Sequence, residues 1–475
     1  MARLRITREN RRDYMLTEPM RRLVPAMALP TIMSAIISSL YNLADTYFVS
    51  QIGSGATAAV GINSSLDQLI SITGSFFAMG ASSYISRLIG AKNEKKAERV
   101  LATAFYTALA FGVVVLIIGK IFMVPLIRFL GATPDIEQYA MDYADYVLYA
   151  APLMAAQLVL NNALRSEGSA AFAFVGLTLG GVLNCGLDPL FITTLGMGVK
   201  GASIATALSK LASFSILLSP YIRKKTMLHM SPKNVSYTKD IVSEIAKMGT
   251  PGLSRSSLQM VAGIVMNRIA GGQFSSSVLA AVSVTNRLVM TIRSASLGFS
   301  QGFQPIAGFC WGAKRYDRVL ESYRFSSIAI VILVTIPCTI IFTFASYFIT
   351  AFNKSSDPEM LRIGIIALRA QCITMPLNAW TIVVNSLYSA AGRASGALVI
   401  SMTRQGICFM PLVFTLPRFF GVFGLLAVQP GAEILTIAVV IPLAVSMTRR
   451  IKRLQLEDSE QLGYIPYDIE KLEIS

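Results

Sequence analysis

Charged residues are scarce in this chain of 475 residues, and their scarcity excludes an ordinary soluble protein. Asp, Glu, Lys and Arg make up 14% of the sequence, whereas about a quarter is usual in soluble domains. Hydrophobic residues reach 53%, and the mean hydropathy is +0.57. This composition fits an integral membrane protein.

Histidine and cysteine are also rare, which limits the chemistry open to the chain. The single histidine, His229, lies in a basic connection, so no histidine cluster or histidine proton relay is expected in the membrane. The 5 cysteines fall within apolar stretches and are interpreted as small buried hydrophobic residues. A membrane enzyme would need a nucleophile–base pair or a metal cluster, and the sequence has neither pattern. We therefore expect a protein that is not an enzyme and has no cofactor.

Long apolar runs recur along the whole chain, each near the roughly 20 residues that a helix needs to cross a bilayer. Several contain Gly or Pro, which membrane helices tolerate where neighbouring helices satisfy the freed backbone groups. The sequence therefore predicts an all-α integral membrane protein. Its twelve predicted spans lie at about 23–50, 57–84, 98–122, 138–164, 170–195, 200–222, 244–270, 278–308, 320–350, 361–388, 395–417 and 420–447.

The basic residues are concentrated on one side of this arrangement. The net charge is +16, and 29 of the 42 Lys and Arg lie in the two tails and in alternate connections. The connections 51–57 and 270–276, on the other side, have none. An excess of Lys and Arg marks cytoplasmic segments, so both termini are predicted in the cytoplasm. This placement explains the positive charge without a nucleic-acid partner.

The chain also repeats itself. Residues 90–92 (GAK) recur at 312–314, 222 residues later, and three further matches follow at offsets of 223 or 224. These pairs are 152–155 with 376–379, 161–170 (NNALRSEGSA) with 385–394 (NSLYSAAGRA), and 198–201 (GVKG) with 421–424 (GVFG).

The repeat predicts two bundles of six helices with the same orientation, related by a pseudo-two-fold axis along the membrane normal. The expected organisation is an N-terminal bundle at 1–222, a basic cytoplasmic linker at 223–243, a C-terminal bundle at 244–448 and a cytoplasmic tail at 449–475. Two parallel halves around a cleft are typical of transporters.

A charged side chain within a membrane span costs free energy to bury, so each one needs an explanation. The N-terminal half has Asp45, Asp67 and Asp188, of which Asp67 fits a rim position as well as a functional one. In the C-terminal half the candidate is Glu433, which is interpreted as a polar group at the kink of 429–431. Most of the arginines are interpreted as lying near span ends or as stabilising a bundle by pairing with backbone carbonyls, and one of them could instead line the cleft. These arginines are Arg255, Arg268, Arg287, Arg293, Arg369 and Arg404.

A cation site is the candidate function of the N-terminal acids. Asn184 and Asp188 are four residues apart and share one helix face, and Pro189 disturbs the backbone beside them. Carboxylate, amide and hydroxyl oxygens suit a proton or Na⁺ rather than a soft metal. The alternative is a buried aspartate that only stabilises helix packing. Further candidate oxygens are those of Asp45, Asn161 and Thr206.

The whole chain resembles the multidrug and toxic compound extrusion (MATE) family, and within it the branch of MepA-like bacterial exporters. The resemblance covers about residues 20–450 and rests on LADTYFVSQIG, GASSYISRLIGAKN, LRSEGSA and NCGLDPLF followed by GVKGASIAT. It implies export of bulky, often cationic amphiphiles in exchange for H⁺ or Na⁺, across the bacterial cytoplasmic membrane. It also implies a cation site whose residues fall on Asp45, Asn161, Asn184, Asp188 and Thr206.

The substrate cleft is predicted from the spans whose polar residues repeat between the halves. Expected partners are small amphipathic molecules and membrane lipid, no nucleic acid is expected, and the protein is expected to be a monomer. A flippase for lipid-linked oligosaccharide or polyprenyl phosphate is the alternative function; it would need a cationic cleft for diphosphate. The candidate cleft residues are Tyr41, Met154, Gln157, Met260 and Asn378.

Overall fold

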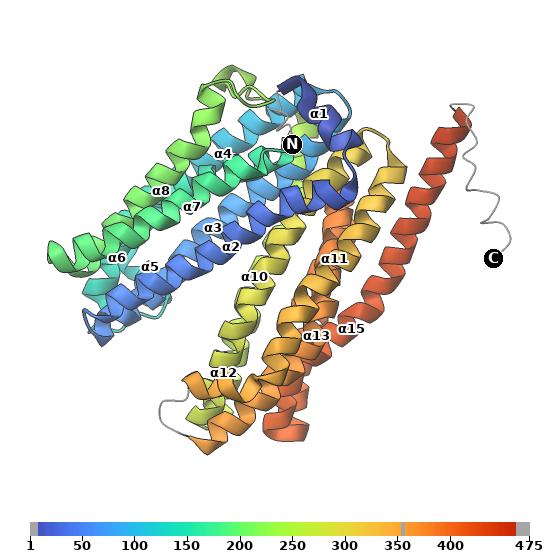
Figure 1. Cartoon of the computed structure of the whole chain (residues 1–475). Coiled ribbons are helices and arrows are strands. Elements are labelled where there is room, and N and C mark those ends of the chain that lie inside the picture. The colour runs from blue at the N-terminus through green and yellow to red at the C-terminus, as the bar shows by residue number, and fades with distance from the viewer. Residues whose placement is uncertain (1–7, 353–356, 462–475) are drawn as a thin grey trace.

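A computed structural model of the chain describes residues 8–352 and 357–461. Within its helices the side chains at 8–10, 40–44, 46, 50, 54, 276 and 459–461 lie outside the description. The helices of the first half, shown in blue to green in Figure 1, are α1 (Arg8–Thr17), α2 (Met20–Ser50), α3 (Ser54–Gly90), α4 (Glu94–Ile121), α5 (Met123–Phe129), α6 (Glu137–Ser166), α7 (Ala170–Pro189), the π-helical turn η1 (Leu190–Thr194) and α8 (Gly198–Ile222).

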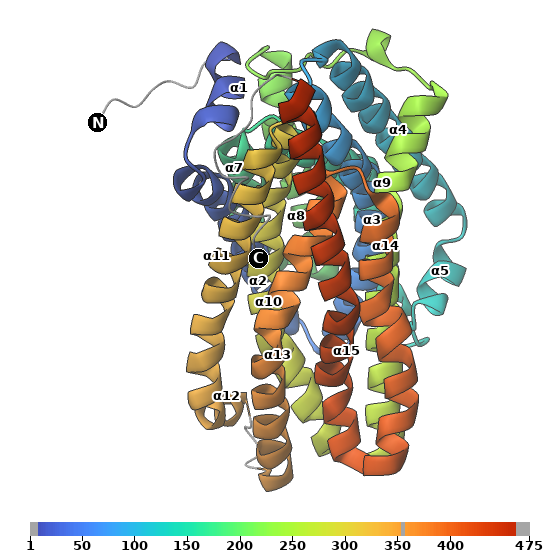
Figure 2. The same cartoon turned by 90° about the vertical axis from the view of Figure 1, so that its right-hand side faces the viewer.

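The second half follows a connection that contains the short 3₁₀ turn η2 (Pro232–Asn234). Figure 2 shows α11, α13, α14 and α15 on one face of this half. Its helices are α9 (Lys239–Gln273), α10 (Ser276–Gly312), α11 (Tyr316–Thr343), α12 (Ala345–Phe352), α13 (Pro358–Ala390), α14 (Ala394–Met402), the π-helical turn η3 (Thr403–Cys408) and α15 (Phe409–Gln461).

The fold class predicted from the sequence is confirmed, because every predicted span contains helix. Among the described residues, 9 helical stretches are long and apolar enough to cross a membrane. The last of these, Ala394–Asp458, joins two predicted spans, and they are separated by a turn at Gly421 (φ 57°, ψ −133°). Helices α9 and α10, which contain buried arginines, are not among the nine. Helix α15 continues beyond residue 448, so the predicted tail begins as helix.

The GVKG and GVFG repeat has a backbone explanation. Gly198 has φ 59° where α8 begins, and Gly421 has φ 57° at the matching place in the second half. Such left-handed conformations favour glycine, because it has no Cβ. Each half therefore turns into its last helix at a glycine with nearly the same positive φ.

The two halves exchange contacts across the pseudo-two-fold axis. Helix α2 packs against α10, and α9 packs against α3. A Cβ added at Gly302 would lie 2.6 Å from the Cα of Ala28, and one added at Gly80 would lie 2.3 Å from the carbonyl oxygen of Ile245. The ribbons of the two halves converge at the end that carries α1 and diverge at the other end (Figure 1). We call these the α1 end and the distal end.

The repeated GAK glycines form the tightest contact of the α1 end. A Cβ on Gly312 would lie 1.9 Å from the carbonyl oxygen of Arg87, and a Cβ on Gly90 would lie 2.2 Å from that of Phe309. Arg87 also forms an ion pair of 2.5 Å with Glu244 in α9. The C-terminal ends of α3 and α10 thus cross backbone against backbone, and we call this contact the GAK crossing.

A buried acid contacts three other segments of the first half. Glu167, in the connection between α6 and α7, is 0% exposed. Its carboxylate accepts hydrogen bonds from the hydroxyl of Tyr221 at 2.9 Å and from the backbone N–H of Met227 at 2.7 Å. Arg11 of α1 lies near enough to interact with it electrostatically. Burial is the main cause that raises the pKa of Glu167, to about 7.

We expect Glu167 to make stability depend on pH. Its ordinary pKa is 4.5 and its folded value is about 7, so between these values the folded state holds a proton that the unfolded state has lost. Stability should therefore fall as pH rises through this window, by at most about 3 kcal/mol. Glu167→Gln should remove that slope in detergent melting temperatures measured from pH 4.5 to 8. A slope equal to that of the wild type would contradict the assignment.

Candidate functional site

The asparagine–aspartate pair predicted from the sequence forms as expected. Asn184 and Asp188 lie in the last turns of α7, and both are buried, with 3% and 0% exposure. The Asn184 Nδ2 donates to Asp188 Oδ1 at 3.3 Å. Pro189 ends the α-helix, and the π-helical turn η1 follows directly. A wider turn at this point is common near functional sites, because it frees backbone groups.

Two further aspartates join this pair, one from α2 and one from α3. Asp45 interacts electrostatically with both Asp67 and Asp188. One oxygen of each of the three carboxylates is buried without a hydrogen-bond partner among the described residues. Helix α3 begins at Ser54, so Asp67 lies about 20 Å along the helix, and the rim position considered for it is excluded.

A lysine and a tyrosine complete the cluster, and the sequence interpretation included neither. Lys210 of α8 interacts with Asp45 and with Asp67. Tyr143 of α6 is hydrogen-bonded to Thr206, one of the predicted site residues. A search of the spans for bases as well as acids would have found Lys210. Three carboxylates face one ammonium group, so the cluster carries an excess of negative charge.

A small cavity opens beside the cluster between α2, α6, α7 and α8. Its volume is about 40 Å³, and its lining includes Gln157, Asn184, Thr206 and Ser209. Gln157 donates from Nε2 to the Ser213 hydroxyl at 2.9 Å, while its Oε1 has no partner among the described residues. Gln157, predicted for the substrate cleft, therefore lines the same cavity as two predicted cation-site residues.

Asn161 does not join the cluster, which corrects its predicted place beside Asp188. Its Nδ2 donates to the carbonyl oxygen of Ala173 at 3.1 Å. Ala173 lies fifteen residues before Asp188 in α7, which is about 22 Å along a helix. The same bond recurs in the second half, where Asn385 donates to Ala397 at 2.8 Å. A bond that both halves share is a packing feature of the repeat.

The other predicted cleft residues have separate surroundings. Met154 is 6% exposed and packs in a hydrophobic cluster of the first half, which corrects its assignment to the cleft. Met260 is partly exposed on α9. Asn378 is buried in α13 beside Arg404. The side chain of Tyr41 lies outside the described residues.

Three arginines of the C-terminal half lie away from the ends of their predicted spans, so the span-end interpretation does not apply to them and the interpretation that they stabilise the bundle stays a prediction. Arg255 is in α9, Arg293 in α10 and Arg404 in η3. The side chains of Arg293 and Arg404 are 17% and 12% exposed. Arg404 interacts electrostatically with both other arginines. In contrast, Arg268, Arg287 and Arg369 are exposed.

Glu433 is the counter-ion of this cluster, so its interpretation as a polar group at a kink is incomplete. It is 3% exposed and accepts a hydrogen bond from Gln429 Nε2 at 3.1 Å. Arg404 Nε lies 3.9 Å and Arg293 Nη2 lies 4.0 Å from Glu433 Oε1. With its amide oxygen turned toward the guanidinium, Asn378 accepts from Arg404 Nη1 at 2.9 Å and from Nε at 3.1 Å.

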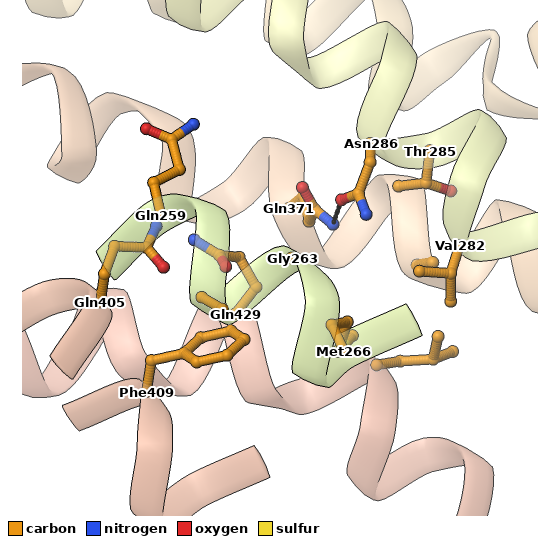
Figure 3. A pocket seen from close by; sticks show the side chains of 13 residues that line it. Gln259, Gly263, Met266, Val282, Thr285, Asn286, Gln371, Gln405, Phe409 and Gln429 are labelled. Atoms are coloured by element: carbon orange, nitrogen blue, oxygen red, sulfur yellow. Dashed lines mark hydrogen bonds between the residues drawn. The ribbon is translucent and has the colours of Figure 1, made fainter. Parts of the chain in front are cut away.

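A cavity of about 150 Å³ lies beside these arginines between α9, α10, α13, η3 and α15. Figure 3 shows amide side chains around it, and Gln371 Nε2 donates to Asn286 Oδ1 at 3.4 Å. A narrower cavity of about 30 Å³ shares two of these amide residues and is also lined by Arg255 and Arg404. We call the two together the C-half cavity. The amide residues around its larger part are Gln259, Asn286, Gln371, Gln405 and Gln429.

Two bundles related by a pseudo-two-fold axis, each with buried charge and a cavity between its helices, define the class of membrane transporters built from repeats. The sequence profile of the MatE family matches residues 30–190 and 251–415, one segment in each half. The chain belongs to the MatE family of multidrug efflux transporters.

Among the described residues, no group of three His, Cys, Asp or Glu side chains is close enough to hold a metal ion.

Several known proteins are similar over most of the chain. The multidrug export protein MepA of Staphylococcus saprophyticus is 25% identical over 399 residues, which are 84% of this chain and 87% of that protein. MepA of Staphylococcus aureus is 23% identical over 414 residues, 87% of this chain and 91% of that protein. An outward-facing multidrug resistance MATE transporter of the MOP superfamily has a TM-score of 0.86 at 24% identity, with 93% of this chain and 98% of that chain covered. A MOP superfamily transporter from Pyrococcus furiosus has a TM-score of 0.85 at the same identity and coverage.

Proposed function

We propose that the protein exports amphipathic, often cationic drugs or toxins in exchange for H⁺ or Na⁺ by alternating access. The cluster of Asp45, Asp67 and Asp188 carries this proposal. Each carboxylate has a buried oxygen without a hydrogen-bond partner among the described residues, and Lys210 neutralises their charge only in part. A cation that enters the cluster would relieve both desolvation and mutual repulsion.

Alternating access needs two conformations that bind the cation and the drug differently. The drug and the coupling cation compete for the same negative charge, so binding of one weakens binding of the other. Pro189 and η1 allow α7 to bend beside Asp188. The GAK crossing would open and close as the two halves rock against each other around the central site.

The coupling ion can be tested directly with purified protein in vesicles. Export of ethidium is measured while a pH gradient and a Na⁺ gradient are imposed separately. Export driven by either gradient, with no chemical change in ethidium, supports the proposal and identifies the ion. Export that depends on neither gradient would contradict the proposed function.

We further propose that the α1 end faces the cytoplasm of a bacterial cell, because it carries the basic tails and connections. Single cysteines placed at Ser231, between α8 and α9, and at Ser54, at the start of α3, should then be labelled from opposite sides. An impermeant maleimide applied outside cells should modify the cysteine at Ser54 and leave that at Ser231 unmodified. Labelling of both from the same side would contradict the twelve-span topology.

A lipid-linked phosphate flippase is the second candidate, and the arginines of the C-terminal half favour it. The three carboxylates of the other half oppose it, because they would repel a diphosphate. Saturable binding of a polyprenyl diphosphate, with no export of ethidium, would favour this second candidate over drug export.

A further inference from the structure

The two charge clusters within the bundles are opposite in sign. The cluster of the first half has three aspartates and one lysine, and that of the second half has three arginines and one glutamate. Lys210 and Glu433 are 223 residues apart, the offset that also relates GVKG to GVFG. The one residue of opposite charge in each cluster, Lys210 or Glu433, therefore occupies the equivalent position in its half. The reversal of charge between the clusters thus follows the repeat.

The arginine cluster has more positive charge than its partners neutralise. Glu433 is one carboxylate for three guanidinium groups, and it lies 3.9 to 4.0 Å from the two that it approaches. Arg293 Nε and Arg404 Nη2 are buried and have no hydrogen-bond partner among the described residues. Buried donors of this kind are costly unless a ligand or partner satisfies them.

One of these donors, Arg404 Nη2, belongs to a side chain that lines a cavity beside the cluster. Arg255 and Arg404 line the narrower part of the C-half cavity, and the amides of Gln259 and Gln405 border both parts. Arg255 also approaches the sulfur of Met79 in the other half, at 4.0 Å. The cavity is thus beside the interface between the halves, within reach of a substrate held there.

We propose that the C-half cavity binds the oxyanion, a carboxylate or a phosphate, of an amphipathic substrate. Guanidinium groups bind such oxyanions through paired N–H donors, and the amides donate further hydrogen bonds. A zwitterionic substrate would place its cationic group toward the aspartates and its oxyanion toward the arginines. The inference rests on the proposed export function. It adds that the protein recognises a negative group on the substrate as well as a positive one.

Rhodamine B and its ethyl ester test this inference, because they differ by one negative charge. Binding of each dye is measured by fluorescence anisotropy with the full chain in nanodiscs. Arg404→Gln should weaken binding of rhodamine B roughly tenfold or more, the effect of a lost charge-assisted hydrogen bond, and leave the ester within about twofold. Arg404→Lys should restore part of the affinity for rhodamine B. Arg369→Gln, which removes an exposed arginine of the same half, is the matched control.

The ester also separates this inference from the proposed function. If the ester is exported but the two dyes respond equally to Arg404→Gln, the oxyanion site is excluded and export stands. If the ester is not exported under either gradient, the proposed function fails, whereas selective loss of rhodamine B binding would still support the site. Displacement of rhodamine B by short-chain phosphatidate would show that lipid phosphate is a source of the oxyanion, and no displacement would assign the site to drug carboxylates.

Discussion

Asp188→Asn and Asp45→Asn are expected to abolish gradient-driven export while leaving a folded protein that still binds drug. Each change removes a negative charge that a coupling cation would neutralise, while the side chain keeps its size. Loss of that charge removes the competition between cation and drug, so export under an imposed gradient should fall roughly tenfold or more. Melting temperature should stay the same or rise, because a buried carboxylate without full pairing is costly.

The measurement combines detergent melting temperature with export from vesicles for the same variants. Asp317→Asn is the matched control, because Asp317 pairs with Arg315 at 2.9 Å on the surface at the α1 end. If Asp188 only stabilised helix packing, the variants would melt early and the surviving protein would couple normally. Well-folded variants that export at the wild-type rate would refute the role of the cluster.

Gly312→Ala is expected to force the GAK crossing apart and to inhibit export strongly. Its Cβ would lie 1.9 Å from the carbonyl oxygen of Arg87, a backbone atom that cannot rotate away. The C-terminal ends of α3 and α10 would have to separate, which shifts the two conformations toward the one that is open at the α1 end. Export needs both conformations, so its rate should fall roughly tenfold or more.

Cys310 reports this opening, because it is 0% exposed two residues from the crossing. In a protein whose other four cysteines are replaced by serine, maleimide should label Cys310 faster in the Gly312→Ala variant. Gly61→Ala is the matched control, since it adds a Cβ near the start of α3 where no atom of the described residues lies within 4 Å. Slow labelling and normal export in Gly312→Ala would show that the crossing is not a gate.

Sequence patterns were sufficient to predict the spans, the repeat and one contact of the candidate site. Hydropathy predicted the spans, because a helix that crosses a bilayer must be apolar over a known length. The repeat predicted two equivalent halves, and the glycines at the matching turns, Gly198 and Gly421, have nearly the same positive φ. The spacing of Asn184 and Asp188 predicted their contact, because residues four apart in one helix are always neighbours.

Contacts between helices could not be predicted in this way, because they depend on how the bundle packs. The family resemblance implied that Asn161 belonged to the cation site, but its hydrogen bond to Ala173 places it far from Asp188. Asp67 could be assigned to the cluster only when α3 was placed beside α2. The arginines of the second half had no identifiable partner until their helices were packed together.

The amino-acid sequence was sufficient for the class of protein, the spans, the repeat and the pair at the end of α7. The spans and the pair depend on length or spacing within one segment, and the repeat is visible by matching one segment with another. Only the packing of the helices shows which buried charges meet: Asp45, Asp67, Asp188 and Lys210 in one half, and Arg255, Arg293, Arg404 and Glu433 in the other. The four members of each cluster come from four different helical elements, so they come within reach of one another only when these elements pack together.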